Sequence, residues 1–370
     1  MEPAYTRPVA AHRPIPWVVL CETERRRWGG DLRRARIFHE LAGRTGGTEA
    51  QGWNHTAVEA AVRRVAGPPF PWRRRPALAS AEFLSEGGVA RARRACRSVV
   101  LDVHDHPLAQ AEALGVALDP ATRRVLVDRL SRNIDLFPLH VAPSASFAEL
   151  AGLDSSRTIV APNGSDTTHV APRPFPAEPA VGMVSGAAPG RGIEALVDAA
   201  RALRRSVPDL RLYLWLATAD EASEAYAASV RAATADEPWV AVAATDYDAL
   251  PGEIARATVL VVPHPPGPYM DVAVPVKLLD SMAAGRPVVV TPRTEMRAIV
   301  EAAGAGRVAG GDGPDELAGA ILPLLEDAAL AARLGAAGRS AAEHVYDWAV
   351  IGRTVAGEVL ARSAALGIAT

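Results

Sequence analysis

The sequence predicts an α/β protein made of two domains, each built on a parallel sheet, that face each other across a cleft. The chain has 370 residues, which is long for one hydrophobic core and usual for two. Short β-branched runs alternate with stretches rich in Ala, Leu and Arg, a pattern typical of strands and helices in parallel sheets. The alternation stops between Pro162 and Pro179, where Pro, Thr and an Asn-Gly pair indicate a linker.

Each half of the chain supplies its own elements. In the first half, strands are predicted at 17–21, 98–103, 139–142 and 158–161, and helices at 31–44, 56–66, 120–135 and 145–151. In the second half, strands are predicted at 180–184, 210–216, 239–243, 258–263 and 287–291, and helices at 192–205, 247–255, 276–284, 294–303 and, nearly without a break, 314–365. Ligands of open α/β sheets bind beyond the carboxyl ends of the strands, so we expect the site in the loops that follow them.

Composition argues against several classes of protein. Apolar residues make up 49% and charged residues 22% of the chain, which is the composition of a globular protein. The formal net charge of −2 gives no reason to expect a nucleic-acid partner. Two cysteines are too few for a disulfide framework or a zinc site, and no apolar run approaches the ~20 residues of a spanning helix. We therefore expect a soluble, cytoplasmic protein without a transmembrane segment.

The stretch from Asp271 to Val290 is the most informative part of the sequence. Pro275 suits the first position of a helix, because its missing N–H would have no partner there, and Gly285 suits the end of the same helix. The preceding predicted strand places this helix start at the carboxyl edge of the sheet. Free amides and the positive end of the helix dipole make such a start a predicted site for a diphosphate.

Lys277 and Asp280 lie three residues apart and therefore share a face of this helix. Lys277, the one lysine of the sequence, has the charge to hold a phosphate. The two carboxylate oxygens of Asp280 can accept hydrogen bonds from two ribose hydroxyls. A surface ion pair worth roughly 0.3 kcal/mol explains the same spacing, and spacing alone leaves both interpretations open.

Two shorter motifs also follow predicted strands. In the run at 100–107, alternation places Asp102, His104 and His106 on one face. These side chains suit contact with a ligand or, with partners from elsewhere, a metal ion; a structural histidine is the third interpretation. Gly29-Gly30 follows the first strand and would let backbone approach a ligand closely, although a tight turn explains it as well.

The run that begins at Pro275 resembles the donor-binding helix and the following strand of GT-B glycosyltransferases, specifically the large retaining family often called GT4. The similar residues are Pro275-Val-Lys277-Leu-Leu-Asp280-Ser-Met-Ala-Ala-Gly285-Arg-Pro287, Thr291-Pro-Arg-Thr-Glu295, Gly304-Ala-Gly306 and Gly335-Ala-Ala-Gly338-Arg339. Segment 159–166 is similar to the interdomain motif of that family, and segment 184–193 to its Gly-rich loop near the donor phosphates. The resemblance covers roughly residues 155–350.

The resemblance implies a GT-B fold with an acceptor-side Rossmann-like domain at 1–170, completed by the last helix at about 349–370, and a donor-binding domain at 178–348. It implies transfer of a sugar, with retention, from a nucleoside-diphosphate sugar to the hydroxyl of a small molecule or glycan, without a metal or other cofactor. The Arg-rich, Lys-poor composition is typical of a GC-rich genome and favours natural-product or envelope-glycan biosynthesis. The sugar, the nucleotide base, the acceptor and the oligomeric state stay open.

The resemblance also assigns roles to single residues. Catalytic contacts with the sugar fall on His104 and Asp271. Donor contacts fall on Gly30, Gly186, Arg191, Val274, Pro275, Lys277, Leu278 and Asp280, and acceptor contacts on Gly29 and His106. The family has two Glu separated by seven residues. The second falls on Asp280, whereas the first falls on Val272, one position after Asp271.

That departure keeps other functions open. One is a nucleotide-sugar-binding protein that lacks transfer activity. Another is a metallohydrolase that uses the cluster Asp102, His104, Asp105 and His106. Separately, the loop at 68–76 combines aromatic residues with three successive arginines, which suits an acceptor loop, a peripheral contact with a membrane or an exposed loop with its aromatics tucked in.

Overall fold

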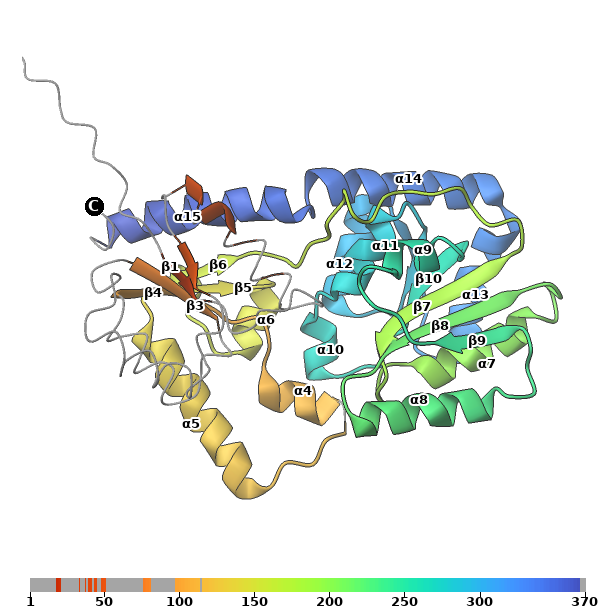
Figure 1. Cartoon of the computed structure of the whole chain (residues 1–370), viewed down its shortest axis with the longest axis horizontal. Coiled ribbons are helices and arrows are strands. Elements are labelled where there is room, and N and C mark those ends of the chain that lie inside the picture. The colour runs from red at the N-terminus through yellow and green to blue at the C-terminus, as the bar shows by residue number, and fades with distance from the viewer. Residues whose placement is uncertain are drawn as a thin grey trace, which may run out of the picture.

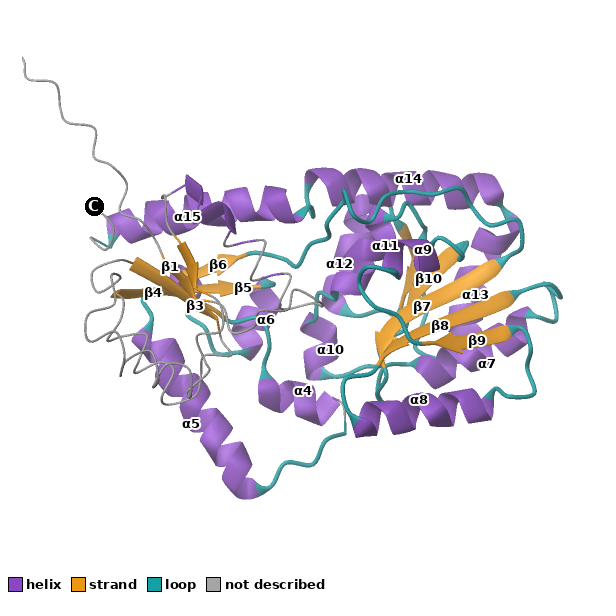
Figure 2. Ribbon diagram, viewed as in Figure 1, coloured by secondary structure: helices purple, strands orange, loops and turns teal. Residues whose placement is uncertain are grey.

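The computed structural model describes residues 97–366 apart from Leu114, together with residues 18–20, 33, 37, 39–41, 43–44, 48–50 and 76–80. Within these residues the chain forms two six-stranded sheets in which every strand pairing is parallel. Helices surround both sheets, and the two sheets lie at opposite ends of the molecule (Figures 1 and 2). The α/β class predicted from the alternating pattern is confirmed.

The first sheet has the strand order β2-β1-β3-β4-β5-β6. Its strands are β1 (Val18–Leu20), β2 (Thr48–Ala50), β3 (Pro76–Ser80), β4 (Arg97–Asp102), β5 (Leu139–Ala142) and β6 (Thr158–Val160). Its fully described helices are α4 (Pro107–Ala113), α5 (Pro120–Leu136) and α6 (Ala145–Leu150). The start of α5 follows from its sequence: the side chain of Asp119 accepts hydrogen bonds from the first free amides, and Pro120 occupies the first turn.

The second sheet has the order β12-β11-β10-β7-β8-β9. Its strands are β7 (Ala180–Gly186), β8 (Arg211–Ala217), β9 (Val240–Ala243), β10 (Val259–Val262), β11 (Val288–Val290) and β12 (Gly306–Val308). Numbered along the chain this is the order 3-2-1-4-5-6 of a Rossmann sheet. The four residues of β10 are all buried, as expected of a central parallel strand that is covered on both faces.

The helices of the second sheet connect its strands and then continue to the end of the chain. They are α7 (Ile193–Leu203), α8 (Glu221–Ala233), α9 (Leu250–Ile254), α10 (Pro268–Val272), α11 (Val276–Ala283), α12 (Thr294–Ala303), α13 (Pro314–Glu326), α14 (Ala328–His344) and α15 (Trp348–Ala365). None of the helices in the described part of the chain combines the length and the apolar character needed to cross a bilayer.

The last helix, α15, packs on the first sheet and not on the second (Figure 1). Its Trp348, Ile351 and Val355 share a hydrophobic core with Val100 and Ile159 of the first sheet. The turn before it is fixed to the linker, because Ser165 donates from its backbone N–H to the carbonyl of residue 346 and accepts from the N–H of Trp348. The C-terminal segment thus ties the two halves together.

Several elements differ from the sequence prediction. The strands β2, β3 and β12 and the helices α4, α8 and α10 lie where none was predicted. The predicted helix at 314–365 is interrupted at Asp327, whose side chain caps α14, and again at 345–347. The predicted helix at 56–66 and most of the loop at 68–76 lie outside the described residues.

Candidate active site

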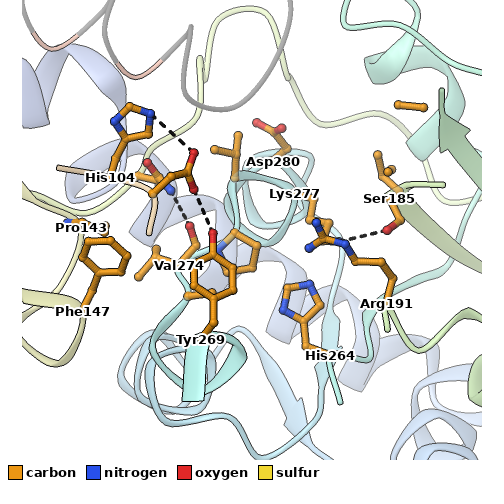
Figure 3. Close-up of a pocket in the computed structure, with 18 of the residues that line it drawn as sticks. His104, Pro143, Phe147, Ser185, Arg191, His264, Tyr269, Val274, Lys277 and Asp280 are labelled. Carbon is orange, nitrogen blue, oxygen red and sulfur yellow. Dashed lines mark hydrogen bonds and ion pairs between the residues drawn. The ribbon is translucent and has the colours of Figure 1, made fainter. Parts of the chain in front are cut away.

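A cavity of about 290 Å³ lies between the two sheets (Figure 3). The first half of the chain contributes His104, Asp105, Pro143, Phe147 and Asn163 to its wall. The second half contributes residues from the ends of β7 and β8, from the segments that follow β7, β9 and β10, and from α11. The cavity is therefore at the carboxyl edge of the second sheet, where the sequence predicted the site.

The centre of the cavity is the point where the second sheet reverses its strand order. Strands β7 and β10 are neighbours there, and the chain leaves them towards opposite edges, which opens a crevice for ligands. Gly186 ends β7, Arg191 lies in the loop after it, and His264 lies in the loop after β10; all three line the cavity. Gly192 has a φ of +77°, and a Cβ atom there would lie 1.8 Å from the carbonyl oxygen of Pro263. Only glycine lets this loop pack closely enough to place Arg191.

The start of α11 faces this cavity. Val274, Pro275, Val276 and Lys277 all line it, and no described side chain caps the helix start. Pro275 has extended backbone and precedes the first helical residue, so the prediction that it occupies the first helical position is off by one; Gly285 follows the helix with a φ of +68°, as predicted. Asn163 Nδ2 donates to the carbonyl of Val274 at 2.6 Å, which fixes the helix start to the linker.

Two cations flank the helix start. Lys277 Nζ donates to Ser185 Oγ at 3.3 Å, and the Nε of Arg191 is buried without a hydrogen-bond partner among the described residues. Burial, and secondarily the charge of Arg191, lowers the pKa of Lys277 to about 7. Burial also lowers the pKa of Arg191. The charge of Asp105 acts on Arg191, but neither cation forms an ion pair with a described carboxylate, and two cations held this close form a binding site for an anion.

Asp280 lies one turn further along α11. It is 5% exposed, and Ser165 Oγ donates to its Oδ1 at 2.6 Å. Burial raises its pKa to about 7; the Ser165 hydrogen bond opposes that rise and Asp166 adds to it. The surface ion pair between Lys277 and Asp280 is not formed. Both side chains instead border the cavity.

On the side of the first sheet, Asp102 at the end of β4 forms ion pairs with Arg33 and His104. It is fully buried, and Arg33 donates to it from Nε at 3.1 Å and from Nη2 at 3.0 Å. His104 Nδ1 lies 2.9 Å from the other carboxylate oxygen. Burial opposes charge on both groups, but the ion pairs prevail and hold the pKa of Asp102 well below its usual range while raising that of His104. Asp102 thus orients His104 at the cavity wall.

A hydrogen bond crosses the cavity mouth. Tyr269 Oη, from α10, donates to Asp105 Oδ1 at 2.9 Å, and α10 packs against α4 and α6 of the first half. His104 Nε2 lies 3.7 Å from the second oxygen of Asp105. His104, Asp105 and Tyr269 therefore form a polar group in the cavity wall. Figure 3 shows His104 on one side of the cavity and Arg191 and Lys277 on the other.

Some predicted residues are not brought to the cavity. Asp271 pairs with Arg293 Nη1 at 2.9 Å and does not line the wall. Leu278 is fully buried in the core of the second sheet. His106 Nδ1 accepts from the amide of residue 109 and borders a separate hollow beside α5. Gly29 and Gly30 lie outside the described residues.

The geometry also bears on the metal interpretation of the cluster at 102–106. Asp102 uses both oxygens on Arg33 and His104, and His106 faces away from His104 into its own hollow. Among the described residues, no group of three or more His, Cys, Asp or Glu side chains is arranged to hold a metal ion. The cluster is therefore a hydrogen-bonded unit and not a set of free ligands.

The family described as Glycosyl transferases group 1 matches residues 178–327, the part of the chain that holds Arg191, His264 and the α11 start. This part of the chain is therefore similar to the group 1 glycosyltransferases. No curated protein matches it by sequence.

Solved structures support the fold of the whole chain. Sucrose-phosphate synthase from Thermosynechococcus elongatus aligns with a TM-score of 0.69 and 15% identity, over 95% of this chain and 100% of that one. Anabaena HepE in complex with UDP and glucose gives 0.68 and 18%, over 94% and 100%. WaaG, a glycosyltransferase involved in lipopolysaccharide biosynthesis, gives 0.63 and 15%, over 92% and 99%. The fold is GT-B, with two Rossmann-like domains, as predicted.

Sequence reasoning missed two residues that line the cavity, His264 and Tyr269. His264 directly follows the strand predicted at 258–263, so the rule that ligands meet the carboxyl ends of strands pointed to it. Tyr269 lies on α10, which was not predicted, and its partner Asp105 is 164 residues away. No local pattern signals such a contact.

Proposed function

We propose that this glycosyltransferase moves a sugar from a nucleoside-diphosphate sugar to a hydroxyl acceptor with retention of configuration, as a GT4-like enzyme. The observation that carries the proposal is the pair Arg191 and Lys277 at an uncapped helix start inside the cavity between the domains. Two unneutralised cations and free amides fit the doubly charged phosphates of such a donor. HepE, whose solved complexes contain UDP, UDP and glucose, or UDP-glucose, makes a uridine nucleotide the first donor to test.

The donor is proposed to lie along the cavity from α11 towards the first domain. The diphosphate sits between Arg191 and Lys277, and Asp280 accepts hydrogen bonds from the ribose. The sugar then reaches the polar group of His104, Asp105 and Tyr269. Because Asp271 is engaged by Arg293 and Val272 stands where the family has Glu, we assign the sugar hydroxyls to this polar group.

In the proposed reaction, the bond between the anomeric carbon and the phosphate oxygen breaks through an oxocarbenium-like state. The acceptor oxygen attacks from the same face, and its proton passes to the departing phosphate oxygen, so no side chain acts as a base. The protein positions the reactants and stabilises charge on the leaving diphosphate. Arg191, Lys277 and the helix start supply that stabilisation, and we propose that no metal ion is required.

Thermal unfolding in the presence of UDP, GDP, ADP and dTDP tests the donor site, because a ligand selective for the folded state raises the melting temperature. We expect one of the four to stabilise the protein and the variants Lys277→Ala and Asp280→Ala to bind it less tightly. If both variants bind as tightly as the parent, the assignment is wrong. Retention is tested separately by determining the anomeric configuration of the product.

Val272 and the engaged Asp271 favour one competing function, a nucleotide-sugar-binding protein without transfer activity. The two functions give different results when the sugar form of the stabilising nucleotide is incubated with acceptors. Transfer releases the nucleoside diphosphate in proportion to the product formed. Tight binding without release over a broad acceptor panel supports the binding protein.

A further inference from the structure

We propose that His264 is a third ligand of the donor diphosphate, beside Arg191 and Lys277. The proposal rests on the proposed function of the cavity and names a residue to which no role was assigned from the sequence. His264 is the second residue after β10, at the reversal point of the second sheet, and lines the cavity. Figure 3 shows its ring directed towards the side chain of Arg191.

The first support is an unsatisfied buried side chain. His264 is 1% exposed, and neither Nδ1 nor Nε2 has a hydrogen-bond partner among the residues that the structure describes. Its backbone is held firmly, since Thr291 Oγ1 donates to its carbonyl at 2.6 Å. A buried polar group without a partner costs stability. An imidazole fixed in this way at a cavity wall is explained by a ligand that supplies the missing bond.

The second support is the charge that surrounds the ring. Three cations face it: Arg191 from the loop after β7, Lys277 from α11 and Arg293 from the loop after β11. Arg293 is neutralised by Asp271 at 2.9 Å and by Asp312 at 2.7 Å, but Arg191 and Lys277 form no ion pair with any described residue. The uncompensated positive charge at the ring is thus on the cavity side, which is where an anion would lie.

Burial and these cations hold the pKa of His264 well below its usual value, so the ring is neutral in the free protein. A neutral imidazole carries one N–H, which can donate to a phosphate oxygen. A bound diphosphate replaces the net positive field with a negative one, and this raises the pKa of the ring. Diphosphate binding should therefore be coupled to protonation of His264 as the pH falls. The contribution of His264 to diphosphate affinity should increase towards low pH.

The experiment compares His264→Phe and His264→Gln with the parent, using whichever of UDP, GDP, ADP and dTDP binds most tightly, together with its nucleoside. Phe fills a similar volume without a donor, and Gln restores an N–H. We expect His264→Phe to weaken diphosphate binding about tenfold or more and to leave nucleoside binding unchanged. His264→Gln should recover part of the loss.

A matched control is His140→Phe, which changes another buried histidine that does not line the cavity. His140 Nε2 bonds to the carbonyl of Ile134 at 2.9 Å, so His140→Phe should lower stability without changing affinity for the diphosphate. His264→Phe should weaken diphosphate binding without lowering stability, because it removes a buried polar group that has no hydrogen-bond partner among the described residues. A His264→Phe protein that is less stable but binds the diphosphate normally would assign His264 a structural role and overturn the proposal.

Nuclear magnetic resonance of ¹⁵N-labelled histidine provides an independent readout. The ring nitrogens of His264, assigned by their absence in His264→Gln, should be those of a neutral imidazole near pH 7 and should shift when the diphosphate binds. Unchanged ring resonances with a saturating diphosphate overturn the proposal while leaving the donor site intact. If none of the four diphosphates binds the parent protein, the proposed function itself fails, and the two failures are thus distinguishable.

Discussion

Replacing Lys277 with Met should make the free protein more stable and the nucleotide complex weaker. In the free protein the ammonium group lies in the cavity wall beside Arg191, and its only described hydrogen bond is to Ser185 at 3.3 Å. Its pKa falls from the ordinary 10.5 to about 7. A lowered lysine pKa means that the folded state disfavours the charge, and an apolar side chain of similar length removes that penalty.

The size of the effect follows from the pKa. Each unit corresponds to about 1.4 kcal/mol, so the penalty reaches roughly 4 kcal/mol at neutral pH. Water in the cavity screens part of it, and we expect Lys277→Met to raise the free energy of unfolding by about 2 kcal/mol. Loss of a charge-assisted bond to phosphate should weaken nucleoside diphosphate binding by about 10-fold or more.

The sign of the pH dependence gives a stricter test. Between about pH 7 and 10.5 the unfolded chain binds more protons at Lys277 than the folded protein does, so wild-type stability should rise with pH across that window. Lys277→Met should lack this contribution. Lys277→Arg, which stays charged, should also lack it and remain less stable than Lys277→Met at every pH.

Urea unfolding followed by tryptophan fluorescence, at pH values of about 6, 7, 8 and 9, measures all three proteins. The reasoning is refuted if Lys277→Met is less stable than the parent near pH 6, or if it keeps the same pH slope. Either result would mean that the folded state accommodates the lysine charge at no cost.

Three further predictions follow from single contacts. The pKa of Asp280 is about 7 in the free protein, so the contribution of Asp280 to nucleoside diphosphate affinity should fall as the pH drops through 7; calorimetric titrations measure this contribution as the difference between the parent and Asp280→Asn, which keeps the opposite pH dependence of Lys277 and His264. Gly192→Ala would place Cβ 1.8 Å from a carbonyl oxygen at a φ of +77° and should lower stability by about 2 kcal/mol or more while weakening diphosphate binding through Arg191. Equal diphosphate affinity in the parent and Gly192→Ala would show that this loop does not position Arg191 for the diphosphate. Arg33→Met leaves the fully buried Asp102 without its guanidinium and should cost about 3–5 kcal/mol in urea unfolding; a loss below about 1 kcal/mol would show that Asp102 is not charged in the folded protein.

The fold was predictable where local pattern and tertiary burial agree. The strand at 139–142 was predicted to the residue, because its β-branched and apolar side chains are buried on both faces. Strand β12 was not predicted, since it has three residues and Gly and Arg supply two of them. Helix α8 was not predicted either. Most of its residues are exposed, and of its thirteen residues only Ala227 and Val230 are buried, so its apolar stripe is too narrow to recognise.

The site was predictable only to the extent that its residues follow one another in the sequence. Lys277, Pro275 and Asp280 belong to one helix start, and their spacing alone indicated a shared face. The role of Asp271 could not be read in this way. Its partner Arg293 lies 22 residues further on, and whether Asp271 faces the sugar or Arg293 depends on how α10 turns between the domains.

The sequence indicated Arg191 and Lys277 but not their burial without ion pairs, which gives the cavity its electrostatic character. Asp102 shows what a buried charge requires in this protein, namely an arginine and a histidine that satisfy its oxygens. Arg191, Lys277 and His264 have no such complement among the described residues, although they border the same cavity. Two buried cations and a neutral imidazole without partners at one cavity wall are explained by a ligand that supplies the missing charge and hydrogen bonds. The free energy that these groups cost the empty protein is recovered when an anion binds, and in the proposed reaction the same groups stabilise the charge that develops on the departing diphosphate.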